Sequence, residues 1–170
     1  MMVIVDAGTS FKSGAYLPDK SDAMTIAAFK AFCTKAETTT ERKICWLWTD
    51  WAYDSVAWKE YCQCHGITHE FTAPYSSAQN GLAEWVIRTT IDDVQTLLCD
   101  PSLSHSYWAE AAAYSIDTRN LIPSCWHPGN IPTESFSGKR QSVTHLHVFG
   151  SVRLQTIKTN RRQSKSKRFQ

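Results

Sequence analysis

The sequence has 170 residues, of which 42% are hydrophobic and 20% charged, and its formal net charge is +2. A chain of this size fits one domain with a substantial core. No apolar stretch approaches the roughly 20 residues that a bilayer-spanning helix needs, and no basic segment typical of a signal peptide precedes the first apolar residues. The six cysteines are therefore expected as free thiols. These features predict a soluble intracellular protein without membrane contact.

The charge is unevenly distributed along the chain. Residues 1–134 carry all 16 acidic residues and nine Lys/Arg, for a net charge of −7, whereas residues 135–170 carry nine Lys/Arg and no acidic residue. Such a basic block indicates a nucleic-acid contact or a localisation signal, and a solvated, disordered end is the alternative. The candidate contacts in the tail are Lys158, Arg161, Arg162, Lys165, Lys167 and Arg168.

Short apolar segments alternate with helical patterns in chain order. Strands are predicted at residues 3–6, 11–17, 43–49 and 67–71, the third of them buried. Helices are predicted from Ser21 or Asp22 to the threonines at 38–40, then at 55–64, 82–98 and 104–120. Gly66 is expected to close the second helix. A closing strand pair is expected at 143–154. This order predicts an α/β protein with a mixed sheet and helices on its faces.

Three carboxylates occur at ends of the predicted elements. Asp6 follows the first apolar strand, Asp50 follows the third, and Glu84 lies in the first turn of the helix that starts after a polar loop at 76–80. Divalent magnesium prefers oxygen ligands and is usually held by a few carboxylates together with substrate phosphates. The pattern therefore predicts a divalent-metal site.

Several short motifs occur in a specific order and spacing. They are T-D at 49–50, H-G-I at 65–67, T-A-P-Y at 72–75, Q-N-G at 79–81, A-E at 83–84, Y-W-A-E-A at 107–111, N-L-I-P at 120–123 and H-L-H-V-F-G at 145–150. Together these motifs resemble the integrase core of copia-type retrotransposons, and the resemblance extends from about Val3 to about Phe169.

The resemblance implies a ribonuclease-H-like fold, with a mixed central sheet flanked by helices, and a two-ion catalytic site. Two Mg²⁺ or Mn²⁺ ions would activate the attacking oxygen and stabilise the leaving oxygen of a phosphoryl displacement. Asp6 would bridge both ions, and Asp50 and Glu84 would each hold one. The implied reactions are trimming of the element's DNA ends and attack of a 3′-hydroxyl on target DNA. A cellular ribonuclease H fits the Q-N-G-x-A-E context less well.

The resemblance also implies partners and an internal organisation. Gln79, Asn80 and Arg88 are expected to contact nucleic acid, although Asn80 before a glycine is equally suited to a turn or a helix cap. The ligand implied is DNA, with RNA as a further candidate, and the working form would be a homo-oligomer in the nucleus. The expected divisions are a catalytic core at 1–122, an extension of the core at 123–157 and a disordered basic tail at 158–170.

Departures from the family pattern leave two alternative functions open. Trp48 and Trp85 stand where the family usually has arginine, and the sequence after Asp50 lacks the usual glycines. A decayed, non-catalytic nucleic-acid-binding remnant is therefore the first alternative, since lost arginines weaken phosphate binding; packing of these tryptophans in the core is the simpler explanation. A zinc-binding interaction module is the second alternative. Its candidate ligands are Cys62, Cys64, His65 and His69, although their spacing is poor for zinc.

Overall fold

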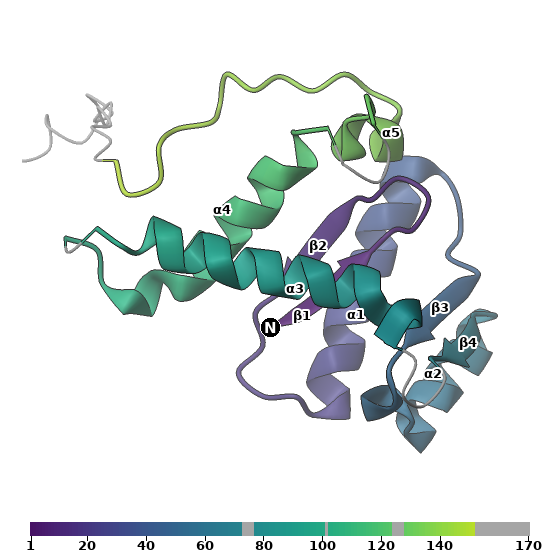
Figure 1. Cartoon of the computed structure of the whole chain (residues 1–170). Coiled ribbons are helices and arrows are strands. Elements are labelled where there is room, and N and C mark those ends of the chain that lie inside the picture. The colour runs from purple at the N-terminus through teal and green to yellow at the C-terminus, as the bar shows by residue number, and fades with distance from the viewer. Residues whose placement is uncertain (73–76, 101, 124–127, 152–170) are drawn as a thin grey trace, which may run out of the picture.

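The computed structural model describes residues 1–72, 77–100, 102–123 and 128–151, without the side chains of residues 77–80 (Figure 1). The fold is mixed α/β, as the sequence predicts, with two small sheets and several helices. In Figure 1 the helix α3 (Ser77–Leu97) crosses in front of the sheet formed by residues 2–5 and 12–15. The helix α1 (Asp22–Thr40) lies behind that sheet. No helix within these residues is long and apolar enough to cross a membrane.

The predicted single mixed sheet is replaced by two separate sheets in the described residues. Strand β1 (Met2–Val5) pairs antiparallel with β2 (Lys12–Ala15), with Met2 opposite Ala15. Strand β3 (Trp46–Thr49) pairs in parallel with β4 (Thr68–Phe71). The sheets do not join because β1 and β3, which face one another, are separated by a cavity.

Helix α1 ends within the threonines at 38–40, as the sequence predicts. The hydroxyls of Thr38, Thr39 and Thr40 donate to the carbonyl oxygens four residues earlier, at 2.7, 2.7 and 2.9 Å. The hydroxyls of these β-branched residues thus have hydrogen-bond partners inside the last turns of the helix. Glu41 follows as the C-cap residue and adopts a left-handed conformation with φ of 57°.

The predicted closure of α2 (Val56–His65) by Gly66 is confirmed. The Ser55 side chain accepts from the backbone N–H of Trp58, and Gly66 closes the helix with φ of 67°, a conformation that glycine adopts without steric cost. The main apolar core lies where α2 meets α1. Trp58 is fully buried there and packs against the rings of Phe29 and Tyr61 at centroid distances of 5.4 and 6.3 Å.

The second half of the chain covers the β1–β2 hairpin with helices. The short 3-10 helix η2 (His105–Tyr107) leads into α4 (Trp108–Asn120), which packs against α3 and β2. Gly14 allows a close contact between β2 and α4, because a Cβ there would lie 2.7 Å from the Cδ1 atom of Ile116 and would force that side chain to shift. Ala112 and Ile116 of α4 face inward, whereas Trp108 is 44% exposed.

The described part of the C-terminal region differs from the sequence prediction. The expected strand pair at 143–154 does not form within the described residues 143–151, where the chain makes turns instead. An unpredicted short helix, α5 (Pro132–Ser137), precedes this segment and ends at Gly138. Its Phe136 ring stacks on Phe11 with centroids 4.2 Å apart. Residues 152–154 and the predicted basic tail lie outside the described residues.

Candidate functional site

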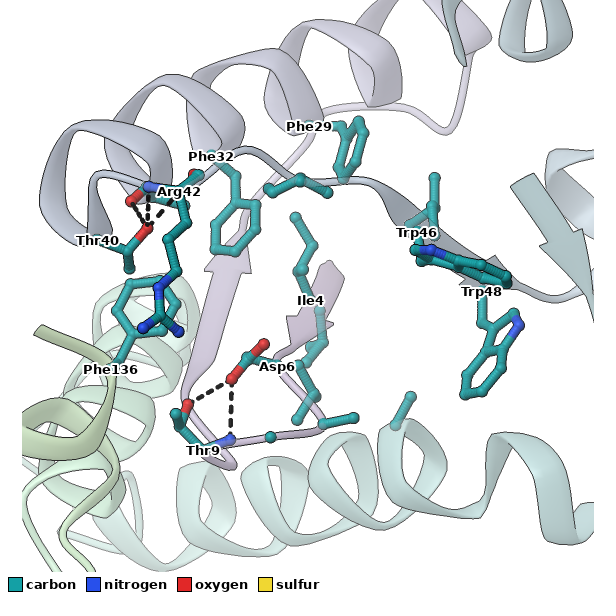
Figure 2. A pocket seen from close by; sticks show the side chains of 18 of the residues that line it. Ile4, Asp6, Thr9, Phe29, Phe32, Thr40, Arg42, Trp46, Trp48 and Phe136 are labelled. Carbon is teal, nitrogen blue, oxygen red and sulfur yellow. Dashed lines mark hydrogen bonds between the residues drawn. The ribbon is translucent and has the colours of Figure 1, made fainter. Parts of the chain in front are cut away.

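Asp6 organises the turn between β1 and β2. Its Oδ2 atom accepts from the backbone N–H of Thr9 at 2.9 Å and from the Thr9 hydroxyl at 2.6 Å (Figure 2). Its backbone N–H donates to the carbonyl oxygen of Phe11 at 2.8 Å. A short acidic side chain that bonds to the backbone of its own turn is a common way to fix a tight turn. Asp6 therefore has a structural role in this arrangement.

Asp50 lies just beyond β3 and starts the 3-10 helix η1 (Trp51–Tyr53). One of its carboxylate oxygens accepts from the backbone N–H of Ala52 at 3.1 Å, and the side chain is exposed. The Trp51 ring stacks on Phe71 at 5.2 Å, and its indole N–H donates to the carbonyl oxygen of Thr72. The helical turn and this stacking support the segment without a positive φ. The loss of the family's glycines therefore leaves the backbone after Asp50 unstrained.

Glu84 lies well inside α3 rather than in its first turn. Helix α3 begins at Ser77, because the segment predicted as a polar loop continues the helix toward the N-terminus. The Glu84 side chain is exposed. In the described residues no group of three or more His, Cys, Asp or Glu is placed to hold a metal ion. Asp6, Asp50 and Glu84 are therefore not brought together as a ligand set here, and their role in metal binding stays a prediction.

A cavity of about 1280 Å³ separates β1 from β3. We call it the interstrand cavity. Its side walls are the two strands, Phe29 and Phe32 of α1 border it on one side, and Leu82 and Ile87 of α3 border it on the other. Figure 2 shows this arrangement, with Asp6, Ile4 and Trp46 among the side chains drawn. Asp6 and Asp50 both line the cavity, whereas Glu84 is not among the described residues that line it.

The tryptophans of β3 contradict the prediction of a buried strand. Trp46 and Trp48 are 63% and 64% exposed. The Trp48 indole N–H donates to the carboxylate of Glu70 on the neighbouring strand β4. Core packing therefore does not explain the tryptophan at position 48. Trp85, the second tryptophan at a position where the family usually has arginine, is partly buried in α3.

The predicted nucleic-acid contacts are only partly within the described structure. Gln79 and Asn80 belong to the first turns of α3, so Asn80 does not lie in a loop. The structure does not describe the side chains of these two residues. Arg88 is exposed on α3. The tail candidates lie outside the described residues: Lys158, Arg161, Arg162, Lys165, Lys167 and Arg168.

One group of basic residues was missed by the sequence analysis. Arg42 and Lys43 follow α1, Lys139 follows α5, and all three line the interstrand cavity. They are exposed. The excess of positive charge after residue 134 includes Lys139, but nothing in the sequence indicates that it lies near Arg42. The tertiary packing of α5 against α1 brings them to one place.

The predicted zinc ligands lie in different environments and do not form one site in the described residues. Cys62 is 2% exposed in the core, and burial raises the pKa of its thiol, which disfavours the thiolate that zinc requires. Cys64 is exposed. His65 shares a 2.8 Å hydrogen bond with the carbonyl oxygen of Tyr61, and His69 shares one of 2.8 Å with the hydroxyl of Thr49. These described residues form no metal-binding group, so the zinc alternative gains no support.

Comparisons with known proteins relate this chain to transposon polyproteins. It is 35% identical, over 133 residues and 77% of its length, to the retrovirus-related Pol polyprotein from transposon TNT 1-94 of Nicotiana tabacum. It is 28% identical over 133 residues to the corresponding polyprotein from transposon RE1 of Arabidopsis thaliana. The chain spans about a tenth of the length of these relatives. No family model matches it.

The fold is similar to that of a solved viral assembly. A chain in the cryo-EM structure of the simian T-cell lymphotropic virus intasome, in complex with PP2A regulatory subunit B56 gamma, matches 92% of this chain with a TM-score of 0.60. The identity is 18%, and the match covers 53% of that chain. At this identity the likeness concerns the fold alone.

Proposed function

Because this chain is homologous to retrovirus-related Pol polyproteins of copia-type transposons, in an integrase-like region, we propose that it works in DNA integration. In this proposal its fold is ribonuclease-H-like, and it forms the DNA-binding part of a protein that trims the ends of element DNA and joins them to target DNA. The observation that carries the proposal is the 35% identity over 77% of the chain, with the fold likeness as support.

The acidic residues that this chain would contribute to strand joining are Asp50 and Glu84. Both side chains are exposed, and both stand in the T-D and A-E motifs of the resemblance. Asp6 is the weaker candidate, because its Oδ2 atom is engaged by Thr9. In the described residues the three do not form a group that fits a divalent ion. The dependence of strand joining on Mg²⁺ or Mn²⁺ is part of the proposal, and the joining assay below tests it.

The proposed DNA contacts within the described residues are the cations at the interstrand cavity. Arg42, Lys43 and Lys139 line one cavity and are exposed. Lysine and arginine side chains supply most of the sequence-independent affinity for DNA, because their binding to phosphates releases counterions. Arg88 on α3 is a further exposed cation.

A salt series of DNA affinities tests the binding proposal. The chain and its Arg42→Ala and Lys139→Ala variants would be titrated with a labelled duplex, and fluorescence anisotropy would give the affinity at each salt concentration. Each variant is expected to weaken binding and to reduce the slope of log K against log salt by about 1. Lys30→Ala is the matched control, because Lys30 is exposed on α1 but does not line the cavity. Equal effects of all three substitutions would contradict the assignment of this surface.

A joining assay separates the catalytic proposal from its rival. The second candidate is a nucleic-acid-binding remnant without catalysis, favoured by the lack of a three-carboxylate group in the described residues. Labelled branched DNA would be incubated with Mn²⁺ and the chain, Asp50→Asn, Glu84→Gln or the exposed control Glu60→Gln. Joining that the first two substitutions abolish, and the control preserves, would favour catalysis. DNA binding without joining by any protein would favour the remnant.

A further inference from the structure

Trp46 and Trp48 form one exposed face of β3. Side chains alternate between the two faces of a strand, and Leu47, which lies between the tryptophans, packs against the core around Trp58. Both tryptophans therefore point away from that core, and both are exposed. Figure 2 shows them together at one end of the interstrand cavity. We call these two residues the tryptophan pair, and they present a large aromatic surface.

The ring of Trp48 is held by its edge. Trp48 is paired with Glu70 of β4, and its indole N–H donates to the Glu70 carboxylate. This bond occupies the polar edge of the indole and fixes the orientation of the ring, so less freedom is lost when a ligand binds. Trp51 differs, because its ring stacks on Phe71 and forms part of the packing. A ligand of the tryptophan pair would therefore meet the flat faces of exposed rings.

Cations lie on the N-terminal side of the tryptophan pair. Arg42 and Lys43 are exposed, and the chain from Lys43 to Trp46 spans at most about 10 Å. Lys139 lines the same cavity. Proteins that bind single-stranded nucleic acid combine a positively charged groove for the backbone with aromatic side chains for the bases. This region supplies both kinds of group.

We propose that the tryptophan pair stacks on unpaired bases of single-stranded DNA, whose phosphates contact Arg42 and Lys43. Residues two apart on a strand are separated by about 6.6 Å, roughly twice the 3.4 Å between successive charges of one DNA strand, so bases of one strand can reach both rings. Stacking tolerates any base, since every base has a π face. The inference rests on the proposed function and adds to it a preference for unpaired DNA beside Asp50, which follows β3 directly.

A positively charged peptide is the rival ligand. The face of a tryptophan ring attracts cations, and the carboxylates of Glu70 and Asp50 lie on the side of the pair that is opposite the cations. The Glu70 carboxylate, however, is already engaged by Trp48, and Arg42 and Lys43 would repel a positively charged peptide. Charge complementarity therefore favours a DNA strand.

Binding of DNA strands with and without bases tests the proposal. A labelled oligothymidine, an abasic oligonucleotide of the same length and a duplex would each be titrated with the full chain, with fluorescence anisotropy as the readout. We expect the oligothymidine to bind at least about tenfold more tightly than the abasic strand. Trp46→Ala and Trp48→Ala should each weaken oligothymidine binding by about tenfold. Neither should change the abasic affinity or the salt slope, because the phosphate contacts remain.

Two kinds of control variant make the result specific to stacking. Trp46→Phe and Trp48→Phe keep an aromatic face and should retain most of the oligothymidine affinity. Tyr107→Ala removes an aromatic ring that is 50% exposed but does not line the interstrand cavity, and it should leave all three affinities unchanged. Circular dichroism checks that each variant folds.

The outcomes separate this inference from the proposed function. Equal affinity for the two single strands would overturn the inference, and salt-dependent duplex binding in the same experiment would leave the proposed function standing. Binding of an oligolysine peptide that Trp48→Ala weakens, without any preference for bases, would identify the rival ligand and overturn the inference. A preference for oligothymidine that depends on the tryptophan pair, without duplex binding, would support the inference and contradict the proposed duplex contacts.

Discussion

The two outer edges of the β1–β2 hairpin are closed in different ways. On the β2 side, the buried Asn120 of α4 accepts from the backbone N–H of Lys12 at 2.9 Å and donates to its carbonyl oxygen at 2.7 Å. A side-chain amide thus replaces a neighbouring strand at this position. On the β1 side, Val3 and Val5 face the interstrand cavity, and no strand of the described chain pairs there.

The difference shows how a short sheet can end inside a protein. Buried backbone groups need partners, and an asparagine offers both a donor and an acceptor at one site. This solution serves one residue, whereas the β1 edge presents several backbone groups along an apolar cavity. One side chain cannot serve all of them, and in the described residues no strand pairs with this edge. The N-L-I-P motif of the sequence therefore contains a residue whose observed role is structural.

The largest loss of folding stability should come from a substitution in the apolar core between α1 and α2. Trp58 is fully buried, and its indole N–H donates to the hydroxyl of Thr25 at 3.3 Å. Trp58→Ala should destabilise the protein by about 3–5 kcal/mol, because it removes a large buried ring and leaves a void. Chemical denaturation measures this change. Ile87→Ala is the control, because Ile87 borders the same cavity but is only partly buried, and its expected loss is about 1 kcal/mol. Similar losses would mean that the open side is packed as tightly as the core.

Opening the closed edge of β2 should have an intermediate effect. Asn120→Ala leaves the N–H and C=O of Lys12 without the amide partner, at an expected cost of about 2 kcal/mol. The amide of Lys12 should also exchange faster, approaching the behaviour of the β1 edge. Gln95→Ala, at an exposed position on α3, should change stability little. Unchanged exchange at Lys12 after Asn120→Ala would contradict the comparison of the two edges.

The smallest expected effect is on the pH dependence of folding stability, and it involves His69. Burial lowers the pKa of His69, and nearby Lys59 lowers it further, against an opposing influence of Asp54. The unfolded chain therefore binds a proton more readily near the usual pKa of about 6.5, so His69 favours folding above that pH and loses this contribution as the pH falls below it. Between about pH 7.5 and 5.5, the midpoint temperature of thermal unfolding should therefore fall less for His69→Gln than for the native chain. An identical pH response would show that His69 does not titrate in this way.

Local signals in the sequence were sufficient to place most elements. Ser55 and Gly66 set the two ends of α2 because capping depends on residues within one helical turn. The start of α3 was wrong, because the residues before Gly81 carry polar side chains typical of a loop yet continue the helix. Helix α5 was missed for a similar reason, since its few residues lie between prolines and glycines and gain support from the contact of Phe136 with Phe11.

The sequence by itself determined the family resemblance, the alternation of strands and helices and the uneven charge, because motifs, periodicity and composition are local properties of the chain. Only the tertiary structure decided the surroundings of each site residue. It engaged Asp6 in its own turn, left Trp46 and Trp48 exposed, and placed Arg42 and Lys139 along the same cavity. It also separated β1 from β3 across a cavity. These outcomes depend on contacts between segments far apart in sequence, and such contacts form only when the helices pack against the sheets.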